Sequence, residues 1–307
     1  RVGPLPALDE LDLLLRRADQ TMYGAKISGR NKVLFFDPHA ESVLHSRKKI
    51  LEDIMQGLAR NEFELYFQPQ IELKTHRLVG FEALLRWNHP QAGLLLPDVF
   101  LTPHVQEKLG PQIGDWVLKS AIKQLQEWQE MQVNTRLSVN ISANHLQQKS
   151  FSSKLAEFLF DAPEVDPACL ELEILESVEP EDFDALKNVI KDCHRLGVTI
   201  ALDDFGTGYS SLNIVRSLAI DVLKIDRSFI INMLENTDDR SIVTVIIDLC
   251  RTFNRQVVAE GIESAAHIAS LNAMGCHLGQ GYGIARPLPV AEVKQWINAY
   301  NSEFGVS

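Results

Sequence analysis

Residues 198–208 read VTIALDDFGTG, an apolar and β-branched run that ends in two aspartates and a glycine-rich turn. The run at 198–202 has the composition of a short buried strand, and the segment near 180–196 before it has helical spacing. Asp203 and Asp204 would therefore stand at the C-terminal end of a strand. On their own they could equally form a plain acidic turn before the glycines.

The same unit recurs along the chain. Helical segments are predicted near 98–109, 113–131, 144–160, 180–196, 228–254, 263–274 and 289–302. Strands are predicted at 64–68, 78–84, 137–141, 170–174, 198–202, 222–225, 256–259 and 278–282. The polar link 74–76 favours a hairpin, so the first two strands should be antiparallel. Eight strands alternating with helices over roughly 250 residues favour an α/β fold, a (β/α)8 TIM-like barrel; a doubly wound open sheet is the alternative.

The first forty residues have a different pattern. A helical segment at about 11–27 ends near Gly29, and a short apolar run at 33–36 reads as a strand. One helix and one strand cannot form a core, so we predict that 1–40 is an appendage or the tail of another domain, and that 41–307 is the main domain. The chain begins at Arg1 rather than Met, and we expect a piece of a longer protein.

Composition narrows the possible functions. The net charge of −11 argues against binding to a nucleic-acid polymer, although bound cations can invert the local sign of a site. The four cysteines are far apart and form no CxxC pair, which favours reduced, buried thiols over a disulfide framework or a zinc site. A long apolar span and a signal-peptide pattern are both missing from the sequence, so we expect a cytoplasmic location for this piece, whose parent could be membrane-anchored.

Oxygen-bearing side chains recur at the ends of the predicted strands. They are Glu82, Asn140, Glu173, Asp203, Asp204 and Glu260. The C-terminal strand ends of a barrel form one face, so these groups should meet there. Carboxylates that share a site either raise one another's pKa or bind cations. Oxygen ligands favour Mg²⁺ or Mn²⁺, whereas zinc usually recruits histidine or cysteine.

This ring predicts hydrolysis of a phosphodiester bond by two divalent cations. Two such ions roughly 3.5–4 Å apart would hold the attacking and leaving oxygens at phosphorus. Asp203 and Asp204 are adjacent and could serve neighbouring ions. Lys224 could orient the attacking water, or it could be a structural ion pair within the ring. Arg86 could hold a phosphate through its planar fork, or it could be a surface residue.

At this point the motifs resemble those of EAL-domain cyclic di-GMP phosphodiesterases. They are QP at 68–69, EALLRW at 82–87, SVNIS at 138–142, ELEILES at 171–177, DDFGTGYS at 203–210, LKID at 223–226, AEGIE at 259–263 and GQGY at 279–282. The resemblance covers roughly 48–302. It implies a barrel with an antiparallel first strand, and opening of cyclic di-GMP to linear pGpG with two Mg²⁺ or Mn²⁺ ions.

The resemblance also implies roles for individual residues. One metal ion would be held by Glu82, Asn140, Glu173 and Asp203, and the second by Asp203, Asp204 and Glu260. The predicted catalytic residues are Lys224, Glu260 and Glu176, with Glu176 also supporting the loop that begins at Asp203. The predicted substrate-binding residues are Gln68, Leu84, Arg86, Asp226, Glu263 and Gln280. Which group acts as general base stays open.

Two further features follow from the resemblance. Leu175 stands where many active relatives have threonine, and loss of that hydroxyl could reduce or alter activity. Members of the family often form homodimers near the loop after Asp203. The rival function is a catalytically weak or inactive cyclic di-GMP receptor; a barrel acting only as a scaffold has no positive feature in the sequence.

The segment at about 11–36 resembles the last helix and strand of a GGDEF diguanylate cyclase domain. The residues that carry this match include Ala18-Asp19, Tyr23 and the GRN at 29–31. The cyclase signature itself does not occur in the chain. We therefore expect upstream GGDEF or sensory domains in the parent protein, but no nucleotide synthesis by this piece.

Overall fold

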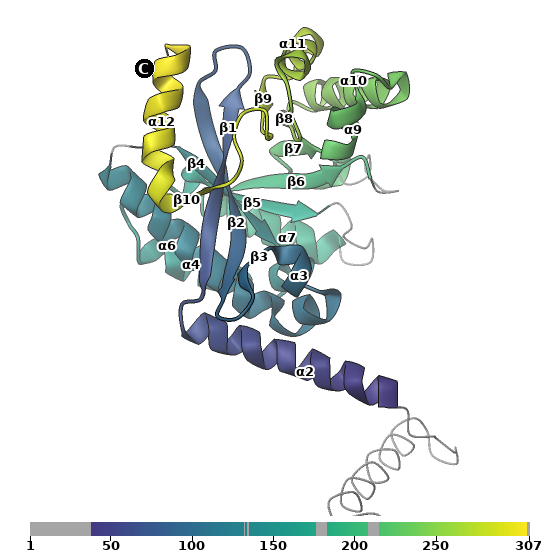
Figure 1. Cartoon of the computed structure of the whole chain (residues 1–307). Coiled ribbons are helices and arrows are strands. Elements are labelled where there is room, and N and C mark those ends of the chain that lie inside the picture. Colours follow the sequence, from purple (N-terminus) through teal and green to yellow (C-terminus); the bar gives the residue numbers. More distant parts are fainter. Residues whose placement is uncertain (1–37, 132, 134, 176–182, 208–214, 306–307) are drawn as a thin grey trace, which may run out of the picture. The chain divides into compact units, whose positions relative to one another are not determined.

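A computed structural model describes residues 38–131, 133, 135–175, 183–207 and 215–305 (Figure 1). The chain divides into two units, Arg1–Asp53 and Ile54–Ser307. The GGDEF-like segment at 11–36 lies outside the described residues, and the domain boundary at residue 40 stays a prediction. Helix α2 (Pro38–Ala59) begins the described part, and the strands of the described residues belong to the second unit.

The second unit is built around a closed barrel of eight strands. These are β1 (Phe63–Glu72), β2 (Leu78–His89), β4 (Arg136–Ile141), β5 (Leu170–Leu175), β6 (Thr199–Phe205), β7 (Val222–Ile225), β8 (Gln256–Ala259) and β9 (Leu278–Gly279). The strands neighbour one another in the order β1-β9-β8-β7-β6-β5-β4-β2, and pairing of β1 with β2 closes the ring. Short strands β3 (Gly93–Leu95) and β10 (Leu288–Pro289) are attached to β2 and β1. The predicted barrel is confirmed, and the open sheet is excluded.

Strand β1 is antiparallel to both of its neighbours in the barrel, β2 and β9, whereas the other neighbouring pairs are parallel. The hairpin predicted between 68 and 78 is therefore confirmed. Its polar turn is held by Thr75 Oγ1, which donates to Glu72 Oε2 at 2.6 Å, and by His76 in the left-handed region at φ 58°. The register places Gln68 opposite Glu82.

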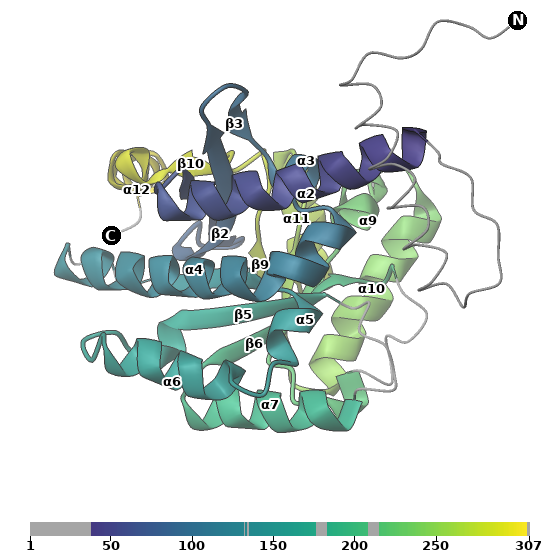
Figure 2. The ribbon, with the colours of Figure 1, turned by 90° about the horizontal axis from the view of Figure 1, so that it is seen from below.

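Helices flank the strands, as Figure 2 shows for α4, α6 and α7 beside β5 and β6. They are α3 (Pro97–Phe100), α4 (Pro103–Glu130), α5 (Ala143–Leu146), α6 (Phe151–Phe160), α7 (Phe183–Arg195), α9 (Arg227–Asn232), α10 (Thr237–Thr252), α11 (Ala265–Met274) and α12 (Val290–Phe304). A 3-10 turn, Pro167–Cys169, precedes β5. Across the described ranges, no helix is both long and apolar enough to cross a membrane.

Helix boundaries differ from the prediction at three places. Helix α4 runs through Pro111, where two helices were predicted; Gly110 lacks the Cβ that would clash with the proline ring. The predicted helix 144–160 is broken between α5 and α6. The predicted helix 228–254 is broken at Asn236, whose side chain accepts from the backbone N–H of Asp238 at 2.9 Å and so caps α10.

Helix α4 fixes the first two strands of the barrel. This helix buries one apolar face, and the Trp128 ring on that face packs 4.9 Å from the ring of Phe67 and 5.0 Å from that of Phe81. Phe67 and Phe81 directly precede Gln68 and Glu82. Because successive side chains of a strand point to opposite faces, this packing outside the barrel directs Gln68 and Glu82 into it.

We predict that Gly114→Ala destabilises the barrel. A Cβ at this position would lie 2.1 Å from Nδ1 of His145, which is buried and held by Asp115 Oδ1 at 2.9 Å from Nε2. The overpacking should lower the free energy of unfolding by about 1–3 kcal/mol, more than the gain in helix propensity of about 1 kcal/mol. Urea denaturation measures this change.

A double mutant provides the control. His145→Ala removes the clashing ring, so Gly114→Ala should cost much less in that background, giving a measurable coupling between the two sites. Gly114→Ala as stable as the wild type would show that the close approach is not a constraint.

Candidate active site

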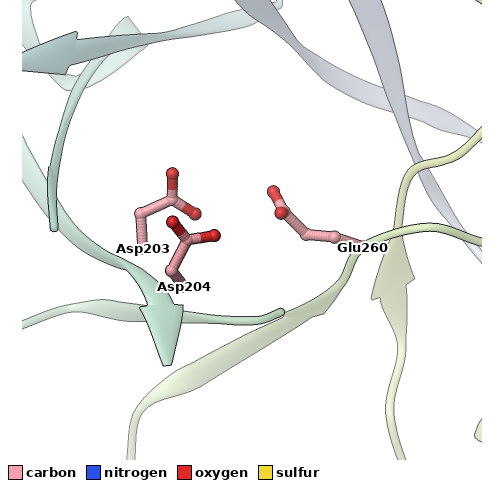
Figure 3. Close-up of side chains that lie close together, drawn as sticks. All are labelled: Asp203, Asp204 and Glu260. Carbon is pink, nitrogen blue, oxygen red and sulfur yellow. The ribbon is translucent and has the colours of Figure 1, made fainter. Parts of the chain in front are cut away.

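The predicted acids gather at one end of the barrel. In the register of the sheet, Glu82 on β2 lies opposite Ser138 on β4, which is two residues before Asn140. Asn140 lies opposite Glu173 on β5, and Leu175 at the end of β5 lies opposite Asp203 on β6. Across the barrel, Glu260 directly follows β8. Oxygen atoms of Asp203, Asp204 and Glu260 lie within 4.8 Å of one another, and Figure 3 shows Glu260 facing the two aspartates.

Lys224 on β7 stands at the centre of these acids and is fully buried. Its ammonium nitrogen lies 2.7 Å from Glu260 Oε1 and 2.8 Å from Glu173 Oε1. Asp203 Oδ1 at 3.3 Å and Glu82 Oε2 at 3.5 Å complete its surroundings. Five carboxylates, counting Asp204, therefore surround one ammonium group.

Amide side chains join the acids into a network. Asn140 Nδ2 donates to Glu82 Oε1 at 3.0 Å. Gln280 Nε2 donates to Glu82 Oε2 at 2.6 Å and to Glu260 Oε1 at 2.9 Å. Gln70 Nε2 in turn donates to Gln280 Oε1 at 2.9 Å. The sequence analysis missed Gln70; its spacing of two from Gln68 on one strand was the signal that both point inward.

The environment shifts the pKa values of these groups in a consistent pattern. Burial raises the pKa of Glu173 well above its usual range, and it raises the pKa of Asp203. Burial with neighbouring carboxylates raises the pKa of Asp204 to about 7 and, despite Lys224, that of Glu260 to about 8. The pKa of Glu82 is lowered, because Lys224 and the amide donors outweigh its burial.

Lys224 keeps its proton. Burial alone would lower its pKa, but the four carboxylates around its ammonium raise that pKa well above the usual range. One ammonium cannot neutralise five carboxylates, and this charge excess adds to burial in raising the pKa values of Glu173, Asp203, Asp204 and Glu260.

Several buried oxygens in the cluster have no hydrogen-bond donor among the described residues. They are both carboxylate oxygens of Glu173 and Oδ1 of Asp203; their contacts with Lys224 are ion pairs without hydrogen-bond geometry. Unsatisfied, buried, anionic oxygens are costly unless a cation binds them. The donor set is all oxygen, which suits a hard divalent cation. The cluster of Asp203, Asp204 and Glu260 is thus consistent with a metal site.

Asp204 has an unusual backbone conformation. Its φ of 54° lies in the left-handed region, which aspartate and asparagine tolerate better than other non-glycine residues. Gly206 two residues later also has a positive φ, 103°, and a Cβ there would lie 2.9 Å from the ring of Phe229. This turn places two adjacent carboxylates on the same cluster instead of on opposite faces of a strand.

The remaining predicted residues lie in different places. Gln68 is buried and donates to Ala285 O at 3.2 Å; it lines a pocket of ≈160 Å³ with Glu82, Glu260, Glu263 and Gln280. Leu84 and Arg86 line a larger cavity of ≈530 Å³ that Asn140 also borders. Leu175 is 43% exposed and lines this larger cavity. Glu176 lies outside the described residues.

Asp226 has a structural task that the sequence analysis did not recognise. It caps the N-terminus of α9 by accepting from Ser228 N at 3.0 Å, and it lines neither pocket. It remains close enough to Asp204 to help raise the pKa of that residue. An Asp two residues before Ser228, at the start of a helical segment, was the sequence signal for this cap.

The raised pKa values predict that the stability of the metal-free protein falls as pH rises. Asp204 and Glu260 bind protons more tightly in the folded protein than in the unfolded chain. In the unfolded chain the pKa values of carboxyl groups are about 4. Their protonation therefore contributes to the free energy of unfolding below pH about 4, and this contribution is lost as the pH rises through about 7 for Asp204 and about 8 for Glu260. The melting temperature in EDTA should fall between pH 5 and 8, and Mg²⁺ or Mn²⁺ should restore it most at pH 8.

Asp204→Asn serves as the control, because asparagine suits the left-handed backbone and does not titrate. This variant should show a shallower fall with pH. A metal-free melting temperature that rises between pH 5 and 8 would contradict the assignment of protons to this cluster.

Comparisons with known proteins agree with this geometry. The family model described as the EAL domain matches residues 51–287. The bifunctional diguanylate cyclase/cyclic di-GMP phosphodiesterase MucR of Pseudomonas aeruginosa is 37% identical over 281 residues, which is 91% of this chain and 41% of the relative. Cyclic di-GMP phosphodiesterase PA2567 of the same organism is 36% identical over 263 residues, 85% of this chain and 45% of the relative.

Solved structures give the same result. The PaMucR phosphodiesterase in complex with c-di-GMP matches with a TM-score of 0.75 and 37% identity, covering 80% of this chain and 99% of that one. The EAL enzyme Bd1971 in its cAMP- and cyclic-di-GMP-bound form matches with a TM-score of 0.79 and 29% identity, covering 95% and 76%. The chain spans less than half the length of the curated relatives it matches. The family model matches more than half of this chain, and the acids of the barrel gather at one end. This chain therefore belongs to the EAL-domain family.

Proposed function

We propose that this EAL domain hydrolyses cyclic di-GMP to linear pGpG with two divalent cations, Mg²⁺ or Mn²⁺. The observation that carries this proposal is the set of five carboxylates around one buried ammonium. Several oxygens of these carboxylates have no hydrogen-bond donor among the described residues. Relatives at about 35% identity include proteins named as cyclic di-GMP phosphodiesterases, and PaMucR has been solved with the nucleotide.

The charge of the cluster supports two cations rather than one. Five ionised carboxylates and one ammonium leave four negative charges, which two divalent ions would neutralise. We propose that Glu82, Asn140, Glu173 and Asp203 hold one ion, and that Asp203, Asp204 and Glu260 hold the other. When bound there, such ions would supply polarisation of the phosphate and a lowered pKa of water.

The residues of the chain orient the reaction. Hydrolysis adds water oxygen to phosphorus and breaks one P–O3′ bond, so that the 3′ oxygen takes a proton and the product ends in a 5′-phosphate. Lys224 holds its proton and carries a positive charge; it fits orientation of water or stabilisation of charge better than removal of a proton. Glu260, 2.7 Å from Lys224, is the better placed proton acceptor among the described residues.

Substrate binding is proposed for both cavities. Arg86 carries the planar fork that suits a phosphate or a base edge, and Leu84 lies beside it in the larger cavity. Gln68, Glu263 and Gln280 line the smaller pocket beside Glu82 and Glu260. For Asp226 we propose an indirect role, through α9 and Asp204. The role of Glu176 behind the loop from Asp203 also stays a proposal.

We further propose that the domain acts as a homodimer within a longer protein that carries upstream GGDEF or sensory domains and works in the cytoplasm. Leu175 borders the larger cavity, so we expect it to affect the rate of the reaction rather than the formation of the acidic cluster.

The decisive experiment is to incubate the protein with cyclic di-GMP and Mg²⁺ or Mn²⁺ and to quantify pGpG by chromatography. Wild-type protein should form pGpG, and EDTA should stop the reaction. Glu82→Gln should lower kcat by at least about 100-fold, because removal of a ligand or its charge weakens the cation site.

Glu171→Gln is the matched control. Glu171 is also a buried glutamate and lies two residues before Glu173 on β5, but it contacts Ser138 Oγ at 2.8 Å instead of Lys224. This variant should retain most of the activity. If wild-type protein binds cyclic di-GMP tightly but forms no pGpG over many hours, the domain is a receptor and not an enzyme. If Glu82→Gln keeps full activity, the assignment of Glu82 as a metal ligand is wrong.

A further inference from the structure

A large aromatic side chain stands exposed at the mouth of the acidic pocket. Tyr282 lines this pocket together with Glu82, Glu260 and Gln280, yet 54% of it is open to solvent. An exposed aromatic ring gains little for the fold, whereas a ring at the entrance to a cleft offers a flat face to a ligand.

The backbone under Tyr282 is tightly held. Ile262 N donates to Gln280 O at 3.0 Å, and Gly283 N donates to Ile262 O at 2.8 Å. The two segments approach so closely that a Cβ on Gly283 would lie 2.5 Å from the carbonyl carbon of Glu263. Tyr282 is therefore presented by a rigid loop, which reduces the entropy that a ligand contact would cost.

An arginine side chain packs against the tyrosine. The loop turns through the bonds from Ile284 N and Ala285 N to Gly281 O, both 3.0 Å, and this turn brings the guanidinium of Arg286 to 4.4 Å from the centre of the Tyr282 ring. One face of the ring is thus covered by a cation that fixes its orientation.

We propose that Tyr282 is a stacking residue for a purine base of the substrate, and that Arg286 is a positioning residue that acts through Tyr282. The inference rests on the proposed function, in which the substrate carries two guanine bases and only one phosphodiester meets the acids. A base beside that phosphodiester reaches the rim of the pocket, where aromatic rings and guanidinium planes are the usual stacking partners of bases.

The test separates a stacking ring from a hydroxyl and from a merely structural residue. Tyr282→Phe keeps the ring, and Tyr282→Ala removes it. Tyr282→Ala should raise KM for cyclic di-GMP roughly 10- to 100-fold with kcat nearly unchanged, because the contact is made equally in the ground and transition states. Tyr282→Phe should keep KM within about twofold of the wild type.

Arg286 has its own pair of variants. Arg286→Gln should raise KM roughly two- to fivefold, and Arg286→Lys should recover part of that loss, since a cation over an exposed ring contributes modestly. Phe160→Ala is the matched control: this aromatic residue is 83% exposed and lies at the end of α6, so KM should not change.

Direct binding of cyclic di-GMP, measured by titration calorimetry, distinguishes failure of this inference from failure of the proposed function. Absence of pGpG from wild-type protein would sink the hydrolase proposal, while weaker binding by Tyr282→Ala would still support stacking. Equal affinity and KM in wild type and Tyr282→Ala would overturn the inference. A Tyr282→Phe variant as defective as Tyr282→Ala would also overturn it, because the hydroxyl would then be the contact. A fall in kcat without a rise in KM in Tyr282→Ala would overturn it as well.

Discussion

Among the described residues, Lys224 is the one cationic side chain inside the ring of five carboxylates, and the end of the barrel that carries these acids depends on it. Apart from the neighbours Asp203 and Asp204 on β6, each acid comes from a different strand or strand end, so no local sequence preference holds the five together. Their mutual repulsion in a buried site must be offset by a shared cation. The ammonium lies within 3.5 Å of four of them, which orients their oxygens toward one point. Removal of this single charge would leave a cluster that only protons or bound cations could stabilise.

The inverted first strand adds a second constraint. Because β1 is antiparallel to its neighbours, Gln68 and Gln70 both enter the barrel interior beside β9, and Gln70 reaches Gln280. Gln280 then donates to both Glu82 and Glu260. Both glutamates therefore have an amide donor and Lys224 beside them. The pKa of Glu82 is lowered because Lys224, Gln280 and Asn140 together outweigh its burial. The pKa of Glu260 is raised to about 8 by burial and by the charges of Asp203 and Glu82.

Much of this arrangement could be predicted from the sequence, because residues that recur at the ends of successive strands lie at the same end of a barrel. Apolar runs that each end in Glu, Asn or Asp had to converge once the strands formed a ring. Contacts that depend on exact side-chain reach could not be predicted, such as the donation from Gln70 to Gln280 or the capping of α9 by Asp226. The continuation of α4 through Pro111 was hidden for another reason: the glycine that precedes the proline removes the usual steric penalty.

Protons and divalent cations compete for the same oxygens, and this competition connects the fold to the chemistry. The low dielectric that raises the pKa of Asp204 to about 7 also makes a bound divalent cation more effective there than in water. Burial therefore does not weaken the site; it makes the cluster costly without cations and receptive to them. The rim of the pocket differs from the cluster, since Tyr282 and Arg286 are exposed and open to a large anionic ligand. A buried, rigid ring of acids and an accessible rim with aromatic and cationic groups together favour a phosphodiester attached to flat bases over a small inorganic phosphate.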